Sequence, residues 1–190
     1  MGDTILDIET APLELRDTEV IDYLINRRTR TDLHPVFSRI VVIGLKEIGK
    51  EPIQFYGEDE QQILRQFWNY LQKHPNTRFI TFNGYQLDIP FIYVRSRINK
   101  IIPTIEIERN SSRMENSNHF DCMLALSHYN TFRWVALDIL CKIHGIPVPE
   151  GRIHGNQIAH LYKKGDWKHI LMHNQNDLVL TEKLYEKFCQ

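Results

Sequence analysis

Apolar and polar positions change their period along the chain, and the changes predict strands first and helices later. β-Branched apolar runs at residues 4–10, 39–49 and 50–57 predict three strands, and a Gly-Lys turn joins the last two as a hairpin. Residues 59–74 carry apolar side chains at three- and four-residue spacings behind an acidic first turn, which is typical of an amphipathic helix. Residues 77–84 predict another strand.

The second half of the chain is predicted to be mainly helical. A helix is expected over residues 85–99, then a polar loop over 109–119, after which structure resumes at 119–129. Helical apolar periodicity returns at 134–146 and 167–188. This order favours an α/β three-layer fold with a mixed central sheet flanked by helices.

Composition limits the possible classes of protein. A chain of 190 residues with 42% hydrophobic content is long enough for one buried domain and short for two, so residues 1–190 are expected to form a single domain. The formal charge of −1, from 23 basic and 24 acidic residues, does not indicate nucleic acid or a membrane. A nucleic-acid partner would need a local patch.

Cysteine spacing and the N-terminus suggest where the protein works. Cys122, Cys141 and Cys189 form no C-x-x-C pair, which argues against a disulfide framework and a zinc knuckle. No export signal and no run long enough to cross a bilayer is visible. We therefore expect a cytoplasmic protein with no membrane partner.

The first candidate chemistry lies in "ILDIET", where Asp7 and Glu9 stand two residues apart in an apolar stretch. On a strand the two carboxylates point to the same face. Like charges side by side are unfavourable unless a cation bridges them, so a hard divalent ion is a natural partner. The alternative is a solvated edge strand.

Two later patterns add acids in specific contexts. Asp88 follows the Asn83-Gly84 corner and stands at the start of a predicted helix, where it could face a site at the sheet edge; an ordinary hairpin corner is the alternative. His173 and Asp177 are four residues apart, and so they are neighbours on one helical face. A solvated face would explain that pair alone.

Together the three motifs resemble one family. "LDIET", "FNGYQLDIPFI" and "HNQNDLVLTEKLY" stand in the order and contexts of the DEDD superfamily of 3′-to-5′ exonucleases, and the sequence is most similar to the exonuclease domain of family B DNA polymerases. The resemblance extends from about Ile5 to Tyr185. It implies a ribonuclease H-like fold, and no polymerase domain is expected in this chain.

The resemblance also implies a metal mechanism and site residues. Two divalent ions about 3.5 to 4 Å apart can activate water and relieve charge on the leaving 3′ oxygen. By resemblance Asp7 would bridge the ions, Glu9 and Asp177 would hold the ion carrying the attacking water, and Asp88 would support the second. Mg²⁺ or Mn²⁺ suits these oxygen ligands better than zinc.

The substrate is expected to be a nucleic acid, with a single-stranded DNA 3′ end favoured and RNA or a short oligonucleotide as the alternative. The resemblance makes Thr10 and Leu13 candidates for the terminal-nucleotide pocket and Asn83 a candidate for a sugar or phosphate contact. Other candidate contacts are basic or aromatic side chains. These are Arg27, Arg28, Arg30, Arg39, Arg109, Arg113, Phe37, Tyr85, Phe132 and Trp134.

His173 leaves the general base open. The family normally has Tyr at this place, and its histidine branch spaces the His five residues before the last Asp, whereas His173 lies four before Asp177. His173 could take the proton of the attacking water, or it could be a tolerated, half-exposed replacement. Other readings are a catalytically inactive nucleic-acid-binding module and a different metal phosphohydrolase, although no H-E-x-x-H or phosphate-loop motif supports the latter.

Overall fold

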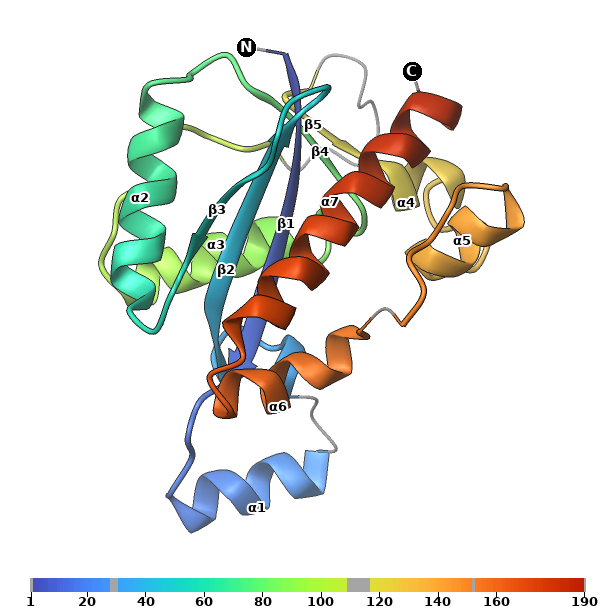
Figure 1. Cartoon of the computed structure of the whole chain (residues 1–190). Coiled ribbons are helices and arrows are strands. Elements are labelled where there is room, and N and C mark those ends of the chain that lie inside the picture. The colour runs from blue at the N-terminus through green and yellow to red at the C-terminus, as the bar shows by residue number, and fades with distance from the viewer. Residues whose placement is uncertain (1, 28–30, 109–116, 152, 190) are drawn as a thin grey trace.

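Five strands form the central sheet of the computed structural model, which describes residues 2–27, 31–108, 117–151 and 153–189 (Figure 1). The strands are β1 (Asp3–Pro12), β2 (Ser38–Glu47), β3 (Ile53–Tyr56), β4 (Arg78–Thr81) and β5 (His119–Asp121). Their order across the sheet is β3-β2-β1-β4-β5. β1 therefore lies in the centre, between an antiparallel and a parallel neighbour.

The sheet is mixed because the first half of the chain folds by hairpins and the second half by crossovers. β2 pairs antiparallel with β3, which confirms the predicted hairpin, and β1 pairs antiparallel with β2 through a connection that contains α1. β1 pairs parallel with β4, and β4 with β5, so helices must connect these strands across a face of the sheet. The predicted α/β class with a mixed sheet is confirmed.

Helices cover both faces of the sheet and make three layers (Figure 1). On one face lie α2 (Glu60–Gln72) and α3 (Asp88–Ile98). On the other lie α4 (Cys122–Leu126), α5 (Leu137–Ile143), α6 (Ile158–Lys163) and α7 (Trp167–Phe188), with α7 running diagonally over the central strands. α1 (Thr18–Arg27) lies away from the sheet, and short 3-10 turns occupy Thr31–Leu33 and Gly155–Gln157.

α2 and α3 are fixed by an apolar face and one buried ion pair. Asp59 caps α2 by accepting a hydrogen bond from the Gln62 amide, and the apolar positions of the predicted helix are all buried. Glu60 Oε1 accepts two hydrogen bonds, one from Arg95 Nε of α3 at 2.8 Å and one from the Ile40 amide of β2 at 2.7 Å. This contact ties α2 and the last turn of α3 to the sheet, whereas Asp88 lies in the first turn of α3.

α7 is anchored near its C-terminal end. Lys46 Nζ of β2 lies 2.6 Å from Glu182 Oε1, which also accepts the Gly49 amide at 2.8 Å. The Tyr185 hydroxyl donates to Asp3 Oδ2 at 2.6 Å. Buried ion pairs fix a register more reliably than they add stability, so these contacts set how far α7 advances along β1.

The structure departs from the predicted elements mainly at the edges. α1 and α6 were not predicted, and the predicted helix over 134–146 is observed only as α5. Most of the predicted polar loop, residues 109–116, lies outside the described residues, as do Arg28 and Arg30. None of the helices that the structure describes combines the length and apolar character needed to cross a membrane.

Candidate functional site

Asp7 and Glu9 project from the middle of β1 toward α7. Asp7 Oδ2 accepts a 2.8 Å hydrogen bond from Asn174 Nδ2, and Glu9 Oε1 lies 2.7 Å from His173 Nδ1. Both partners belong to α7. The prediction that the two carboxylates share one face of the strand is confirmed, and the alternative of an edge strand is wrong because β1 is central.

Asn174 can reach Asp7 because β2 has a glycine at the contact. Gly44 pairs with Asp7 across the β1–β2 ladder, and a Cβ at this position would collide with Asn174 Oδ1 and lie 2.8 Å from Leu178 Cδ1. Asn174 is fully buried, and its Oδ1 accepts a 2.8 Å hydrogen bond from Gln54 Nε2 of β3. The amide is therefore oriented with its nitrogen toward Asp7.

Asp88 is the first residue of α3, as its place after the Asn-Gly corner predicts. Its Oδ1 accepts a 3.0 Å hydrogen bond from the Ile8 amide, so the carboxylate contacts β1 between the two acids of that strand. The corner leads into a helix, and the alternative of a hairpin is wrong.

A buried aspartate of β5 shapes the loop that delivers Asp88. Asp121 Oδ1 accepts the Asn83 amide at 3.0 Å, and its Oδ2 accepts the Tyr85 amide at 2.9 Å. Asn83 has a φ of 70°, in the left-handed region that Asn tolerates better than most residues. Sequence reasoning missed Asp121, although its position at the end of a β-strand was a usable signal.

His173 stands between two of the candidate acids. Its ring is buried, with 5% of the residue exposed, and Nδ1 lies 2.7 Å from Glu9 Oε1 and 3.9 Å from Asp177 Oδ2. The neighbouring placement of His173 and Asp177 on one helical face is confirmed. The ring is buried and not half-exposed, because it packs into the site and its nitrogen is engaged; whether His173 is a base or a tolerated replacement stays a prediction.

Crowded negative charge raises the pKa of Asp7 well above its usual range. Burial is the largest cause, and the neighbouring carboxylates of Glu9, Asp177 and Asp88 add to it, in that order. The hydrogen bond from Asn174 works in the opposite direction and lowers the pKa. Acids from β1, α7 and α3 thus act on Asp7 together.

Burial also raises the pKa of Asp88, to about 7. The hydrogen bond from the Ile8 amide lowers it, and the charges of Asp121 and Glu9 raise it further. The site as a whole is therefore poor at holding negative charge by itself, and a cation would relieve that strain.

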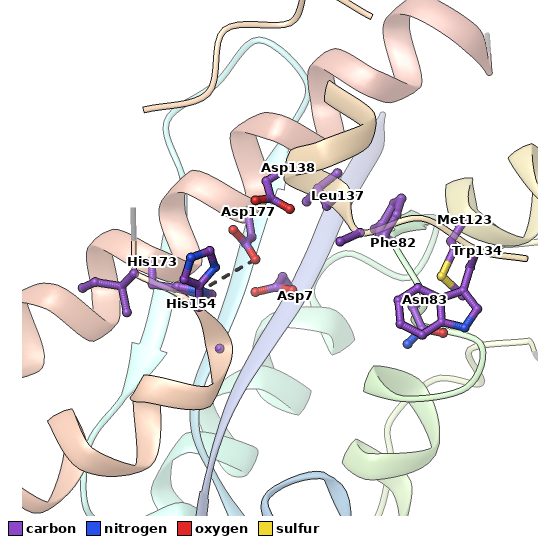
Figure 2. Close-up of a pocket in the computed structure, with 13 residues that line it drawn as sticks. Asp7, Phe82, Asn83, Met123, Trp134, Leu137, Asp138, His154, His173 and Asp177 are labelled. Carbon is purple, nitrogen blue, oxygen red and sulfur yellow. Dashed lines mark ion pairs between the residues drawn. The ribbon is translucent and has the colours of Figure 1, made fainter. Parts of the chain in front are cut away.

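A cavity of about 290 Å³ opens over Asp7 and is lined by residues from several elements (Figure 2). Asp7, Asn83, His173 and Asp177 line it, as do residues that sequence reasoning did not assign to the site, including Asp138 and His154. Figure 2 shows Asp177 and Asp138 close to one another above Asp7. Within the part of the chain that the structure describes, no three His, Cys, Asp or Glu side chains form a ready metal-binding cluster.

The predicted substrate contacts divide into two groups. Asn83 lines the cavity, whereas Thr10 and Leu13 are not among the described residues that line it. The Thr10 hydroxyl instead donates to the Asp32 carbonyl at 2.7 Å, which ties β1 to the turn before β2. Both predictions for the pocket of the terminal nucleotide therefore lack support from the cavity.

The predicted basic and aromatic contacts differ in exposure and in whether they line the cavity. Arg27 is exposed at the end of α1, and Arg39 is half-buried on β2. Phe37 and Tyr85 are half-buried. Phe132 and Trp134 are exposed, and of the four aromatics Trp134 lines the cavity over Asp7. Arg109 and Arg113 lie outside the described residues.

The sequence matches a family described as "Predicted 3'-5' exonuclease related to the exonuclease domain of PolB", over residues 30–190. The chain belongs to this family. The matched range contains Asn83, Asp88, His173 and Asp177 but not β1. The assignment of Asp7 and Glu9 to the site therefore rests on their contacts with α7.

A curated relative and a solved structure are also similar to the chain. The uncharacterized protein MJ0365 of Methanocaldococcus jannaschii is 29% identical over 163 residues, which cover 82% of this chain and 89% of the relative. The family B DNA polymerase of Pyrobaculum calidifontis matches 97% of this chain with a TM-score of 0.73 at 15% identity. The chain spans 24% of the length of that polymerase, so this likeness establishes the ribonuclease H-like fold alone.

Proposed function

We propose that this protein is a metal-dependent nuclease that removes nucleotides one at a time from the 3′ end of single-stranded nucleic acid, with DNA as the favoured substrate and RNA as the alternative. Membership of a family of predicted 3′-5′ exonucleases supports the reaction class. Nucleic acid is the partner that this class implies.

The observation that carries the proposal is the convergence of four carboxylates around the centre of β1. Burial raises the pKa of Asp7 most, and the charges of Glu9, Asp177 and Asp88, which come from β1, α7 and α3, raise it further. Such a group of acids is unfavourable without a cation and is well suited to a hard one.

The donor atoms fit Mg²⁺ or Mn²⁺, because carboxylate oxygens suit these ions and no thiolate takes part. Asp7, Glu9, Asp88 and Asp177 would hold two such ions. When bound, the ions would supply an activated water and stabilise the charge on the leaving oxygen. Glu9 is hydrogen-bonded to His173, and Asp88 is hydrogen-bonded to the Ile8 amide. Both carboxylates are therefore already held in position to bind the ions.

The remaining residues would orient the acids and the substrate. With Glu9 ionised, His173 Nδ1 must carry the proton that it shares with the carboxylate, since an ionised carboxylate only accepts. His173 would thus position Glu9 and place its ring beside the attacking water, while Asn174 positions Asp7. Asn83 lines the cavity and would contact the sugar or phosphate.

The test is digestion of matched DNA and RNA strands that carry a label at the 5′ end. A descending ladder that requires Mg²⁺ or Mn²⁺ supports the proposal and identifies the preferred strand. Asp7→Ala should abolish the ladder, whereas Asp22→Asn, on exposed α1, should leave it nearly unchanged. Undiminished cleavage in excess chelator, or internal cuts in a circular single strand, would refute the proposal.

Absence of cleavage in any metal, combined with tight binding of the same strands, would instead favour an inactive nucleic-acid-binding module. The two outcomes are separated by measuring binding and cleavage on one set of oligonucleotides.

A further inference from the structure

The cavity over Asp7 has two chemically different ends (Figure 2). Asp177 and His173 lie at one end, with Asp7 between the two ends. Trp134, Met123 and Phe82 lie at the other end and give it an apolar, aromatic lining. A ligand that fills the cavity must therefore carry a flat or apolar group close to an anionic or metal-binding one.

Trp134 is unusual for its exposure. It is 65% exposed, although an indole ring is normally one of the most buried side chains by area. A large apolar ring left in water beside a cavity indicates a binding surface. Phe132 is similarly exposed, at 68%, but is not among the described residues that line this cavity.

The segment that displays Trp134 is held in a costly backbone conformation. His128, Tyr129 and Asn130 are consecutive non-glycine residues with φ of 48°, 56° and 67°. Such positions are unfavourable for non-glycine residues and persist only when their surroundings fix them. Ser127 does so here, because its Oγ accepts the Asn130 amide at 3.1 Å and its carbonyl accepts the Phe132 amide at 3.0 Å.

A cation stands next to the exposed indole. Arg133 and Trp134 together line a smaller pocket of about 40 Å³ that also borders Phe82 and Met123, two residues of the main cavity. Arg133 is exposed and is not among the described residues that line the main cavity, so its charge stands outside the cavity, next to Trp134 in the chain. A stacking ring with a neighbouring cation is the combination that holds a base and its phosphate in proteins that bind single strands.

We propose that Trp134 stacks on the 3′-terminal base of a single polynucleotide strand, which places the last phosphodiester over Asp7 and Asp177. This inference rests on the proposed function and assigns the part of the substrate that the apolar end receives. Because every base has a flat face, the contact holds the strand end regardless of sequence.

The direct test uses strands that contain 2-aminopurine, whose fluorescence is quenched by stacking, and a terminal linkage that cannot be hydrolysed. Binding of the parent protein in Mn²⁺ should quench 2-aminopurine at the 3′ end more than at an internal position. Trp134→Ala should lose this difference. Phe132→Ala, an equally exposed aromatic in the same segment, is the matched control and should keep it.

Steady-state cleavage supplies a second readout. Trp134→Ala should raise KM on the order of tenfold or more with kcat within a few-fold, since stacking is worth about 1 to 3 kcal/mol per base. Trp134→Phe should restore most of the loss. A strand with an abasic 3′ residue should bind the parent more weakly by a similar factor and should bind Trp134→Ala no worse than the normal strand does.

The outcomes separate this inference from the proposed function. Terminal quenching that depends on Trp134 without any cleavage would uphold the stacking site and refute the nuclease. Cleavage by the parent without terminal quenching, or equal quenching by Trp134→Ala, would overturn the stacking site and leave the nuclease standing. Running deoxyribose and ribose strands in parallel tells which kind of strand end the site receives.

Discussion

The contact between His173 and Glu9 changes how the histidine is understood. The bond joins residues 164 positions apart at 2.7 Å and is buried. A ring nitrogen that holds a carboxylate is not free to serve as a base on that side, so any proton transfer from water must use the other nitrogen. The histidine therefore has two candidate roles, one in positioning Glu9 and one in the chemistry.

Replacing His173 tests both roles. His173→Ala should lower single-turnover cleavage on the order of a hundredfold, the size usual for the loss of general-base assistance. His169→Ala is a matched control, because His169 lies one turn earlier on α7 and bonds to Asp166 instead of a candidate acid. It should stay within a few-fold of the parent.

A pH profile distinguishes the two roles of His173. If the ring accepts the proton, the parent profile should show an inflection that His173→Ala lacks. If the ring only positions Glu9, His173→Ala should be slower by the same factor at every pH. Cleavage by His173→Ala within a few-fold of the parent throughout would exclude both.

At the scale of single residues the sequence identified the acids but not their supports. Asp7, Glu9, Asp88 and Asp177 stand out because carboxylates at these places in predicted strands and helices are unusual. Asn174 and its partner Gln54 do not stand out, because 120 positions separate them and each is an ordinary polar residue until α7 meets the sheet.

Among the elements, the packing of α7 on β2 sets the geometry of the site. Gly44 is the point of closest approach, and Asn174 occupies the space that a side chain would need. The contact is local to the site, since Asn174 bonds to Asp7 directly.

Gly44→Ala should therefore damage both stability and cleavage. Overpacking of this kind usually costs about 1 to 3 kcal/mol of unfolding free energy, and the displaced helix should weaken the Asn174–Asp7 bond. Urea unfolding of Gly44→Ala, Asn174→Ala and the double variant measures the coupling. The double variant should cost clearly less than the sum of the single variants, because truncating Asn174 makes room for the new methyl group. Strict additivity would contradict this account of the contact.

The elements that the sequence predicted are those that bury a continuous apolar face. α2 and the long C-terminal helix α7 have strong helical spacing, and their observed bounds agree closely with it. α1 has apolar residues at helical spacing, at Val20, Ile21, Leu24 and Ile25, and this signal was overlooked; of these four side chains, Leu24 is the buried one. The start of α1 also carried a signal, because Asp17 accepts the amides of Glu19 and Val20.

At the scale of the whole molecule, a formal charge of −1 hides a concentration of negative charge in one place. The folded protein raises the pKa of Asp88 to about 7, while the unfolded chain should ionise this residue near about 3.9. Between those values the unfolded chain gives up the proton first. The contribution of Asp88 to the free energy of unfolding is therefore complete below about pH 4. It falls as the pH rises to about 7 and stays lost above that pH.

The metal-free protein should accordingly melt at a lower temperature at pH 8 than at pH 5. Asp88→Asn, which cannot ionise, should flatten part of that slope, and Asp22→Asn on exposed α1 should not. Saturating Mn²⁺ should raise the melting temperature most at pH 8, where the carboxylates are ionised. Thermal melts of the three proteins in chelator and in Mn²⁺ provide the measurement; a slope unchanged by Asp88→Asn would contradict the raised pKa.

The candidate site joins β1, near the start of the chain, to α7, near its end, and this has a consequence for biosynthesis. A ribosome makes Asp7 and Glu9 more than 150 residues before it makes His173 and Asp177. A chain still under synthesis carries the first pair of acids without the helix that completes the candidate site. The hydrolytic capacity proposed for this fold would thus arise only when the last helix docks, so a growing chain could not digest the nucleic acids around the ribosome that makes it.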